Sequence, residues 1–550
     1  MRDQGVSGGG LLMRGTMMDF PLVLPTLLER AGKVLGDTEI LSFRPDKSIT
    51  RTTFREFSRR ARQLAKGLTK LGINPGDRVG CMMWNHEAHL ETFFGVPSSG
   101  AILHSLNLRL HPHEIAKIVN HAEDRFLIVD DVLLPLYEKF CDDVKFEAVI
   151  VVPYGFASVP EGFLNYEELL ENGRGEFQYP RIDENDGAAM CFTSGTTGFS
   201  QGVIYTHRSI VLHSLCAATA DGMAMSNQDT VMPLAPMFHA NAWGVPHTAV
   251  MTGARLVFPG PNVEAEHVLD TLRKESVTMA NAVPTVWINV LDALEKNPGR
   301  WKFERPIRVI CGGTAPPIEL MRRLDAHNIH VLHLWGMTET SPLATLGRLK
   351  SRMKNWPEEK KYEIRGKQGW PAPLIELRVM RPEGEVPWDG ATPGEVEVRG
   401  PWVAAQYYNA PDQAYKWTAD GWFRTGDVGT IDEDGIMKLV DRAKDLVKSG
   451  GEWISSVDLE NMLMGHPAVK EACVVGVPHP KWQERPLAAV VLREGAQASD
   501  QELREFLAQK FARWQLPDAF VFLEAIPRTS VGKFKKMALR EQFAGWKWQA

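Results

Sequence analysis

The sequence predicts a large α/β N-terminal part followed by a small α+β domain. This prediction rests on the length of the chain, on alternating helix and strand patterns, and on a compact set of both near the C-terminus. A chain of 550 residues is too long for one hydrophobic core, so two or more domains are expected. Hydrophobic residues make up 44% and charged residues 24%, which excludes a largely disordered chain.

Helix and strand patterns alternate through the first part of the chain. One predicted helix has an apolar face formed by Phe54, Phe57, Ala61, Leu64, Leu68 and Leu71. The run 78–83 that follows is typical of a strand. A second helical pattern at 113–122 precedes a buried-strand pattern at 125–129. Such repetition is typical of a parallel or mixed sheet covered by helices.

A domain boundary is predicted at the charged run 441–445, which follows a strand pattern at 436–440. Beyond it we expect helices at 457–465 and 501–514 and strands at 472–477 and 519–523. About a hundred residues suffice for a small α+β domain. The expected division is a loose Gly-rich tail at 1–15, an N-terminal domain at 16–441, a junction at 442–444 and a C-terminal domain at 445–550.

Charge and cysteine usage exclude several classes of protein. A net charge of -6 disfavours a nucleic-acid binder held by general basicity. The six cysteines include no CxxC pair and no Cys/His cluster, which disfavours a disulfide framework and a structural zinc site and favours a reducing compartment. No stretch approaches the roughly 18 apolar residues of a membrane span, and the N-terminal residues lack the apolar core of a secretory signal. We therefore expect a cytoplasmic protein without a membrane span.

A Gly/Thr/Ser-rich loop follows the apolar run 188–192. It consists of Thr193, Ser194, Gly195, Thr196, Thr197 and Gly198. Glycines let backbone amides approach phosphate oxygens, and hydroxyls add donors without bulk. The loop differs from the Walker pattern because no Gly-Lys-Ser/Thr closes it. Taken alone, it fits a phosphate loop and an ordinary surface loop equally well.

Further motifs follow in a fixed order along the chain. They are Pro236-Met237-Phe238-His239, Gly312-Gly313-Thr314-Ala315-Pro316, Trp335-Gly336-Met337-Thr338-Glu339-Thr340, Gly394-Glu395-Val396, Thr425-Gly426-Asp427, Asp441-Arg442-Ala443-Lys444, Lys448-Ser449-Gly450-Gly451-Glu452 and the run 527–533 ending in Gly532-Lys533. With the loop at 193–202, they make the chain resemble the adenylate-forming acyl-CoA synthetases, a family that includes firefly luciferase and peptide-synthetase adenylation domains. The resemblance covers the chain from about residue 20.

The resemblance implies a fold, a reaction and a set of small-molecule partners. The fold is a large multi-subdomain N-terminal domain of the acyl-adenylate synthetase type with a small mobile α+β C-terminal domain. The reaction is the ATP-dependent, AMP-forming ligation of a carboxylic acid to coenzyme A through an acyl-adenylate. ATP, Mg²⁺ and coenzyme A are the implied cofactors and substrates, no nucleic acid is involved, and a homodimer is left open.

The resemblance also assigns the nucleotide site. Residues 193–198 hold the β- and γ-phosphates, Thr338 the α-phosphate and Glu339 the Mg²⁺ ion. Asp427 binds both ribose hydroxyls, and Arg442 contacts the ribose or phosphate. The adenine is framed by Gly313, Thr314, Ala315, Pro316 and Trp335, and Gly336 and Met337 also belong to the cofactor site. Structural alternatives are a helix N-cap for Thr338 and Glu339, a Gly-Asp turn for Asp427, and a core position for Trp335.

Two lysines and one loop are assigned to the chemical steps. Lys533 bridges the incoming carboxylate and the α-phosphate, although a lysine in a solvated basic tail is the alternative. Lys444 occupies the hinge, where the small domain rotates between the two half-reactions. The pantetheine tunnel is lined by Lys448, Gly450, Gly451, Glu452 and Trp453, the last of which is either a gate or a packed interface residue.

The acyl pocket is assigned to Phe238, His239, Asn241, Trp243 and Gly244. His239 is a gate, or a structural histidine. The mostly apolar lining favours an alkyl substrate. The chain is most similar to medium- and long-chain fatty acyl-CoA ligases and to 3-methylmercaptopropionyl-CoA ligases, so a fatty acid is preferred and 3-methylmercaptopropionate or another short acid is the alternative.

One departure from the family pattern concerns the phosphate loop. Relatives usually have Gly-x-Pro-Lys-Gly, whereas this chain has Gly198-Phe199-Ser200-Gln201-Gly202. Gln201 supplies only neutral donors, so a weaker contact with polyphosphate is expected. A non-catalytic acyl- or nucleotide-binding homologue is one alternative, although Lys533 and Glu339 are both present. A carrier-loading module is another, and no carrier domain is expected before residue 550.

Overall fold

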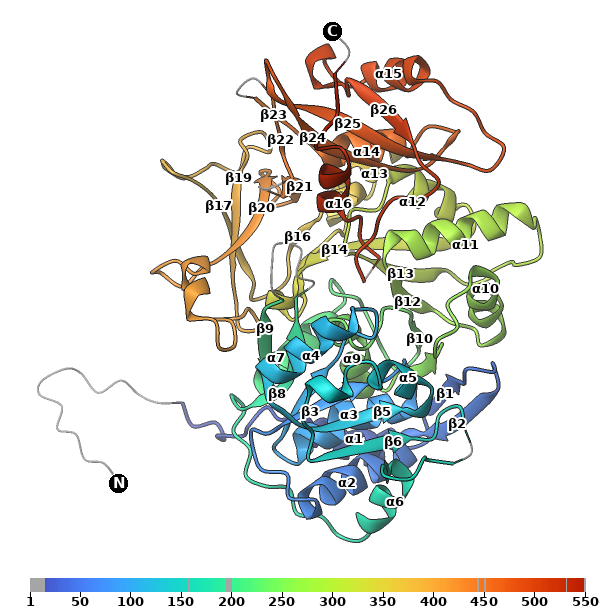
Figure 1. Cartoon of the computed structure of the whole chain (residues 1–550), viewed down its shortest axis with the longest axis vertical. Coiled ribbons are helices and arrows are strands. Elements are labelled where there is room, and N and C mark those ends of the chain that lie inside the picture. Colours follow the sequence, from blue (N-terminus) through green and yellow to red (C-terminus); the bar gives the residue numbers. More distant parts are fainter. Residues whose placement is uncertain are drawn as a thin grey trace, which may run out of the picture.

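The computed structural model describes residues 15–156, 158–193, 200–442, 445–449, 452–530 and 532–548. Sheets in the large domain are followed by one sheet in the small domain at the opposite end of the molecule (Figure 1). This arrangement confirms the predicted fold class. Within the described residues, no helix has the length and apolar character needed to cross a membrane.

A seven-stranded sheet forms one half of the large domain, in the order β7-β6-β5-β3-β4-β8-β9. Its strands are β3 (Arg78–Met82), β4 (Ile102–Ser105), β5 (Asp124–Asp130), β6 (Ala148–Val152), β7 (Leu164–Asn165), β8 (Gly187–Phe192) and β9 (Gly202–Thr206). All pairs are parallel except β8 with β9. The antiparallel return at β9 places Thr193 and Gln201 at the carboxyl end of β8.

A nine-stranded sheet forms the other half, in the order β16-β15-β14-β13-β12-β10-β11-β1-β2. Its strands are β1 (Glu39–Phe43), β2 (Ile49–Thr53), β10 (Thr230–Pro233), β11 (Arg255–Phe258), β12 (Met279–Ala282), β13 (Ile307–Cys311), β14 (Ile329–Gly336), β15 (Leu343–Leu346) and β16 (Trp370–Pro371). The middle of this sheet is parallel. Ligands of open parallel sheets bind at the carboxyl ends of the strands, and the segments after β10, β12, β13 and β14 meet there.

Two smaller sheets complete the architecture. An antiparallel sheet contains β17 (Glu376–Arg381), β18 (Gly384–Glu385), β19 (Gly394–Arg399), β20 (Phe423–Ile431) and β21 (Met437–Arg442). The small domain contains β22 (Val447–Ser449), β23 (Glu452–Ile454), β24 (Val469–His479), β25 (Gln483–Leu492) and β26 (Ala519–Phe522). Its two hydrophobic clusters contain only residues from 447 onward.

Helices cover the faces of these sheets. In the large domain they are α1 (Leu24–Val34), α2 (Phe54–Lys70), α3 (Glu87–Ser98), α4 (Pro112–Ala122), α5 (Leu134–Tyr137), α6 (Tyr166–Asn172), α7 (His207–Ala218), α8 (Ala240–Trp243), α9 (Val245–Thr252), α10 (Ala265–Lys274), α11 (Pro284–Lys296), α12 (Ile318–Asp325) and α13 (Glu358–Gly366). The small domain adds α14 (Ser456–Leu463), α15 (Asp500–Ala508) and α16 (Lys536–Gln542).

Local sequence explains the predicted helices. Thr53 caps α2, because its side chain accepts a hydrogen bond from the backbone N–H of Glu56, and the apolar face from Phe54 to Leu68 is buried. Helix α4 begins with Pro112, whose fixed φ suits the first turn. These helices and β3 and β5 confirm the sequence-based prediction.

The predicted helix at 501–514 is wrong in its second half. Helix α15 ends at Ala508, and a short 3-10 turn follows at Arg513–Gln515. Leu507 of the helix and Leu516 after the turn are both buried in the same cluster, so the chain must turn between them to bring both into it. A continuous helix could not bury both leucines in this cluster. Strand β24 also runs further at both ends than the predicted 472–477.

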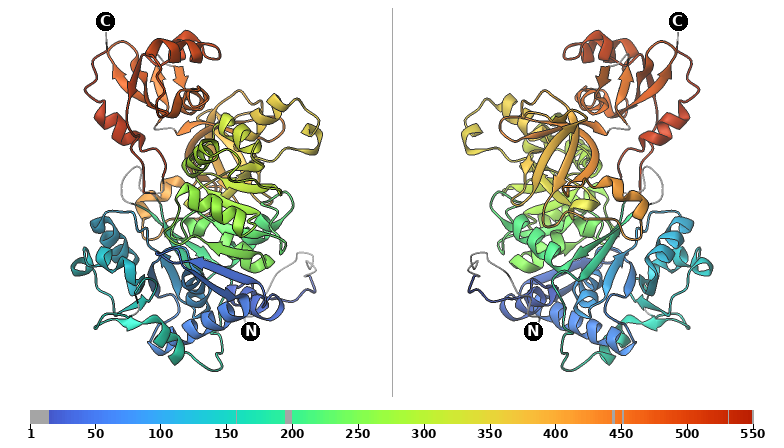
Figure 2. Two further views of the ribbon diagram at one scale, coloured as in Figure 1. Left: turned by 90° about the vertical axis from the view of Figure 1, so that its right-hand side faces the viewer. Right: turned by 90° about the vertical axis from the view of Figure 1, so that its left-hand side faces the viewer.

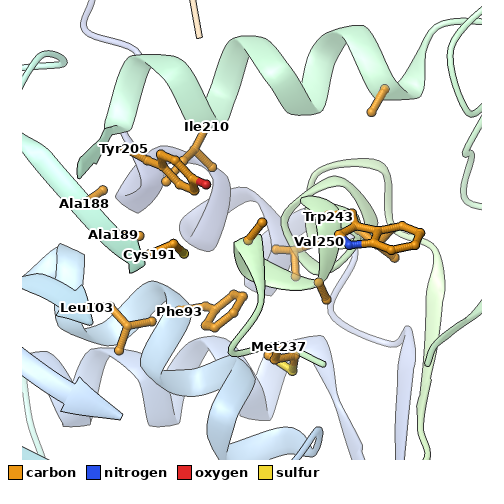
Figure 3. Packing of buried hydrophobic residues seen from close by; sticks show 14 of the residues in the cluster. Phe93, Leu103, Ala188, Ala189, Cys191, Tyr205, Ile210, Met237, Trp243 and Val250 are labelled. Carbon is orange, nitrogen blue, oxygen red and sulfur yellow. The ribbon is translucent and has the colours of Figure 1, made fainter. Parts of the chain in front are cut away.

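One hydrophobic cluster joins the two large sheets behind their carboxyl ends. Figure 3 shows Phe93 of α3 and Val250 of α9 in the same cluster as Cys191 of β8 and Tyr205 of β9. The cluster also includes Trp335 at the end of β14. This shared core fixes the loops of both sheets relative to one another, which is what a site built between them requires.

Candidate active site

A cavity of about 420 Å³ lies where the large sheets, the antiparallel sheet and the small domain meet. Thr193 after β8 and Gly313 after β13 form part of its wall. Arg442 at the end of β21 forms another part, and Lys533 reaches it from the small domain. A site that collects groups from all of these elements is typical of a ligand that must be held at several points.

The turn after β14 carries two buried polar residues of the cavity wall, Thr338 and Glu339. The hydroxyl of Tyr205 donates to the carbonyl oxygen of Thr338 at 2.7 Å, and the backbone N–H of Ala404 donates to the carbonyl oxygen of Glu339 at 2.7 Å. The hydroxyl of Tyr407 donates to Oε1 of Glu339 at 2.5 Å. Among the described residues, the hydrogen bonds of this carboxylate involve only Oε1, so Oε2 remains for a ligand.

Asp427 is buried behind the cavity wall, between two groups that line the cavity. The indole Nε1 of Trp335 donates to its Oδ2 at 2.9 Å, and Arg442 Nε lies 2.9 Å from its Oδ1. The Asp427 carboxylate is also the main cause that raises the pKa of Arg442. Each carboxylate oxygen accepts more than one hydrogen bond, so Asp427 retains acceptor capacity for a polyol.

A hairpin descends from the small domain before α16 (Figures 1 and 2), and Lys533 on its second arm lines the cavity. The hairpin is closed by a bridge between Arg528 and Phe534 and by hydrogen bonds between Thr529 and Lys533. Lys533 Cε lies 3.1 Å from the position that a Cβ on Gly313 would occupy. A side chain at Gly313 would press on the flexible end of the lysine and on Val283, and the φ of +85° at this position already favours glycine.

Burial and charge act on Lys533 and on its neighbour His239. Burial, together with the charge of Arg442, lowers the pKa of Lys533 to about 8, and Asp427 and Glu339 limit this shift. Burial also lowers the pKa of His239 to about 3, helped by the charges of Lys533 and Arg109. His239 is therefore neutral at physiological pH and can donate a hydrogen bond to a carboxylate without being an ion itself.

The apolar part of the cavity is shaped by a left-handed turn. Ala240, Asn241, Ala242, Trp243 and Gly244 all have φ between +43° and +72°. Such a conformation costs about 1–2 kcal/mol per non-glycine residue, and strain of this kind persists where the surroundings enforce it, often at functional sites.

Hydrogen bonds and close packing hold this turn. Asn281 donates to the carbonyl oxygen of Ala242 at 3.0 Å, and the Cys191 thiol contacts the Asn241 amide oxygen at 3.5 Å. Gly244 packs against His213, and a Cβ there would lie 2.4 Å from Cε1 of that ring. The turn thereby directs Trp243 to the cavity and leaves Asn241 and Gly244 behind its wall.

Many of the sequence-predicted site residues meet at this cavity. Those that line it are Thr193, His239, Trp243, Gly313, Trp335, Gly336, Met337, Thr338, Glu339, Arg442 and Lys533. Phe238 lies in a small adjoining cavity that shares Thr193 and His239 with the main one. Pro316 is buried, while Thr314 is exposed beside Gly313.

Other predicted residues are outside the cavity or outside the described part of the chain. Lys448 is exposed on β22 of the small domain, and its backbone N–H donates to Glu484 at 3.0 Å. The positions outside the described residues are Ser194, Gly195, Thr196, Thr197, Gly198, Lys444, Gly450 and Gly451. Glu452 and Trp453 belong to β23, and only their backbone is described.

The sequence reasoning missed one wall of the cavity. It is formed by Tyr407, Gln413, Tyr415, Lys416 and Phe423. The first four belong to no motif and follow one another through an irregular segment and a 3-10 turn at Pro411–Lys416, and Phe423 begins β20. Two adjacent tyrosines at 407 and 408 were the available signal, because aromatic residues with a hydroxyl are common at partly wet sites.

Comparison with protein families gives a direct match over most of the chain. The model of the AMP-binding enzyme family matches residues 28–408, and the model of the AMP-binding enzyme C-terminal domain matches residues 458–533. The chain belongs to the AMP-binding enzyme family. The resemblance stated from the motifs is confirmed. Residues of both matched regions, and of the segment that connects them, line the cavity described above.

Curated relatives of this AMP-binding enzyme match along nearly the whole chain. A long-chain-fatty-acid–CoA ligase from Thermus thermophilus is 48% identical over 96% of this chain and 97% of its own length. A 3-methylmercaptopropionyl-CoA ligase from Ruegeria lacuscaerulensis is 42% identical over 96% and 99%. A medium-chain-fatty-acid–CoA ligase from Ectopseudomonas oleovorans is 39% identical over 96% and 98%.

A solved structure supports the same fold for the AMP-binding enzyme. The anthranilate CoA ligase AuaEII in complex with anthranoyl-AMP has a TM-score of 0.84 at 25% identity, covering 95% of this chain and 98% of that one. ATP-bound MatB from Rhodopseudomonas palustris, at 24% identity and a TM-score of 0.79, shares the fold over 94% and 99% of the two chains.

Proposed function

We propose that the protein converts a medium- or long-chain fatty acid to its coenzyme A thioester in two steps. In the first, a carboxylate oxygen attacks the α-phosphorus of ATP, and pyrophosphate leaves. In the second, the thiol sulfur attacks the acyl carbon, AMP leaves and the thiol proton is released. The observation that carries the proposal is that Lys533 of the small domain and Glu339 of the large domain line one cavity.

Lys533 is the proposed catalytic residue of the first step. The reaction brings a negative carboxylate against a polyphosphate, so a cation between them offsets the repulsion and stabilises the charge that builds on the α-phosphate. The half-buried hairpin holds this ammonium against Gly313. Thr338 is proposed to donate to the α-phosphate from the turn after β14.

Asp427 and Arg442 are proposed to hold the ribose. The carboxylate is fixed by Trp335 and Arg442 and keeps lone pairs for two hydroxyl groups. Trp335 also lines the cavity, beside Gly313, where an adenine ring fits against an aromatic and a backbone surface. Thr193 and the loop that follows it are proposed to receive the β- and γ-phosphates.

Glu339 fits the requirement of a magnesium ion. Mg²⁺ in nucleotide sites is bound by one or two carboxylates together with phosphate oxygens and water. Among the described residues, no group of three or more His, Cys, Asp or Glu side chains is arranged around a metal site, which agrees with a metal that arrives with ATP. Bound there, the ion would neutralise phosphate charge, while Tyr407 orients the carboxylate.

The nature of the acid is proposed from the cavity lining and from the relatives. Met223, Trp243, Leu334 and Leu343 give the cavity an apolar side, and neutral His239 can meet the carboxylate. The relative at 48% identity is named for long-chain fatty acids, which fits this lining. The relative at 42% identity is named for 3-methylmercaptopropionate, so this short acid is the second candidate.

The second step is proposed to need a movement of the small domain about residues 442–444, with Lys444 as the hinge residue. Loop 448–453 would then face the cavity and admit pantetheine. We place the N-terminal domain at 16–441 and the C-terminal domain at 445–550, and we propose a cytoplasmic enzyme. These assignments rest on the order of the motifs and on the family match.

A substrate panel tests the proposal. Purified protein with Mg·ATP, coenzyme A and acids from C2 to C18, plus 3-methylmercaptopropionate, should release AMP fastest with acids of medium or long chain. The matched control is Lys533→Ala, which should release little AMP with any acid. Preference for 3-methylmercaptopropionate would select the second candidate. No AMP release with any acid would favour a non-catalytic homologue.

A further inference from the structure

One helix of the large domain carries the contacts that hold the hairpin of Lys533 in place. Helix α11 buries Trp287, Leu291 and Leu294 in the core beside the nine-stranded sheet. Its other face carries Thr285 and Asp292, two turns apart, and this face lies against the small domain (Figure 1). We call the pair Thr285 and Asp292 the α11 ledge.

Asp292 pairs with two cations of the small domain. Arg493, just after β25, lies 3.0 Å from its Oδ1, and Lys470 of β24 lies 3.8 Å from its Oδ2. The side chains of Asp292 and Arg493 are 23% and 27% exposed. A half-buried pair of this kind is screened less by salt than a surface pair and contributes more.

Thr285 contacts the base of the hairpin of Lys533. Arg528 Nη1 donates to the Thr285 hydroxyl at 2.6 Å and to the carbonyl oxygen of Gly532 at 2.9 Å. Arg528 Nη2 lies 2.7 Å from Glu471 of β24. One guanidinium therefore joins the ledge, the small-domain sheet and the residue that precedes Lys533.

A second group of contacts between the domains lies beside their covalent connection. Lys438 pairs with Asp458 at 2.7 Å, and the Ser455 hydroxyl donates to the carbonyl oxygen of Val440 at 2.6 Å. These residues adjoin the junction at 442–444, so they follow a rotation of the small domain with small displacements. The ledge is more than a hundred residues away in sequence, and a rotation about the junction would separate its contacts.

We propose that the α11 ledge selects the domain orientation of the first half-reaction, with Asp292, Arg493 and Arg528 as positioning residues. This inference rests on the proposed two-step function. While the ledge is engaged, Lys533 lies in the cavity, and its hairpin also contacts the large domain at Asn107, which donates to Ser530 at 2.9 Å. Loss of the ledge contacts withdraws the hairpin, and Lys533 with it, from the cavity before the thiol reacts. The ledge thus sets the balance between acyl-adenylate formation and thioester formation.

Reversal of one charge tests the ledge. Asp292→Arg should slow single-turnover acyl-adenylate formation about tenfold, because it removes two ion pairs and places a cation against Arg493 and Lys470. Thioester formation from supplied acyl-adenylate should be unchanged or faster. The double variant Asp292→Arg/Arg493→Asp restores one pair and should recover most of the first rate. Asp292→Asn, a milder change, should slow the same step about threefold.

Lys296→Ala is the matched control. Lys296 lies on the same helix and pairs with Glu494 of the small domain at 2.9 Å, but the two side chains are 66% and 86% exposed. Exposed pairs contribute little, so both half-reactions should stay within about twofold of the wild-type rates. Equal slowing of both half-reactions by Asp292→Arg, or no slowing, would overturn the proposal.

A distance measurement distinguishes a failure of the ledge proposal from a failure of the proposed function. Spin labels at Lys360→Cys on α13 and Gln501→Cys on α15, both exposed, report the domain orientation in a Cys141→Ser background. Asp292→Arg should shift or broaden the distance distribution, whereas Lys296→Ala should leave it unchanged. An unchanged distribution in Asp292→Arg contradicts the ledge even if the enzyme is active. A wild-type protein that forms no acyl-adenylate refutes the proposed function, whatever the labels show.

Discussion

At the scale of single residues, the depressed pKa of Lys533 links burial to chemistry. Burial is the main cause of its value of about 8, and the charges of Arg442 on one side and Asp427 and Glu339 on the other adjust it. Only the ammonium form can bridge two anions. In the free enzyme this form is lost as the pH rises through about 8, whereas an exposed lysine keeps it to about 10.4.

The pH dependence of the first step follows from this shift. We expect kcat/KM for ATP, measured by pyrophosphate exchange, to fall as the pH rises through about 8. The kcat should fall at a higher pH, because bound polyphosphate favours the charged lysine. Lys533→Arg should move the descending limb beyond the accessible range, since a guanidinium does not lose its proton there. An identical limb in the arginine variant would assign the titration to another group.

Gln201 is the second residue whose effect can be measured directly. It lies on the cavity wall, and its backbone pairs with that of Thr193 at 2.9 Å. Gln201→Lys places a cation beside the expected phosphate position and should lower the KM for ATP several-fold. Pyrophosphate exchange at varied ATP checks this. An unchanged KM would mean that position 201 does not contact the phosphates.

At the scale of secondary-structure elements, the close approach of β14 to β15 fixes the turn that carries Thr338 and Glu339. A Cβ on Gly336 would lie 1.6 Å from the carbonyl oxygen of Pro342, so only glycine fits here. Gly336→Ala must separate the two segments, at a cost of about 3 kcal/mol or more. It should lower thermal stability and reduce acyl-adenylate formation by about a hundredfold.

Gly545→Ala is the control for that substitution, because no atom lies within 4 Å of the added Cβ. It should change neither the melting temperature nor the rate. A Gly336→Ala variant that keeps wild-type activity would show that Thr338 and Glu339 tolerate displacement, contrary to their proposed roles.

Elements with a regular pattern could be predicted, and irregular ones could not. Helix α2 has both an N-cap at Thr53 and an uninterrupted apolar face, so local sequence determines it. The left-handed turn at 240–244 has no such signal, because its non-glycine residues disfavour positive φ and only their packing enforces it. The early end of α15 likewise depends on where Leu516 must be buried.

At the scale of the whole molecule, the order of the motifs predicted which residues meet, but not how the cavity is closed. Trp335, Asp427 and Arg442 were expected at the nucleotide, and the structure joins them by hydrogen bond and ion pair. The wall around Tyr407 and Lys416 was not expected, because it is assembled by tertiary packing of an irregular segment. The docking of Lys533 depends on contacts between domains that no local pattern encodes.

A substitution at the proposed hinge tests the domain movement. Lys444→Pro fixes φ at that position and restricts the residue before it, so it should hinder rotation between the two orientations. We expect thioester formation from acyl-adenylate to slow about tenfold or more, while acyl-adenylate formation stays within about threefold. Rapid-quench measurements of each half-reaction check this. Unchanged rates in both would place the hinge elsewhere.

Lys533 of the small domain is proposed to supply the cation of acyl-adenylate formation to a cavity that the large domain otherwise lines. The direct measurement compares both half-reactions in Lys533→Ala, using a fatty acid that the wild type accepts. Acyl-adenylate formation should fall by about a thousandfold or more, while supplied acyl-adenylate should still react with coenzyme A at near the wild-type rate. Equal losses in the two half-reactions, or wild-type adenylate formation, would contradict it.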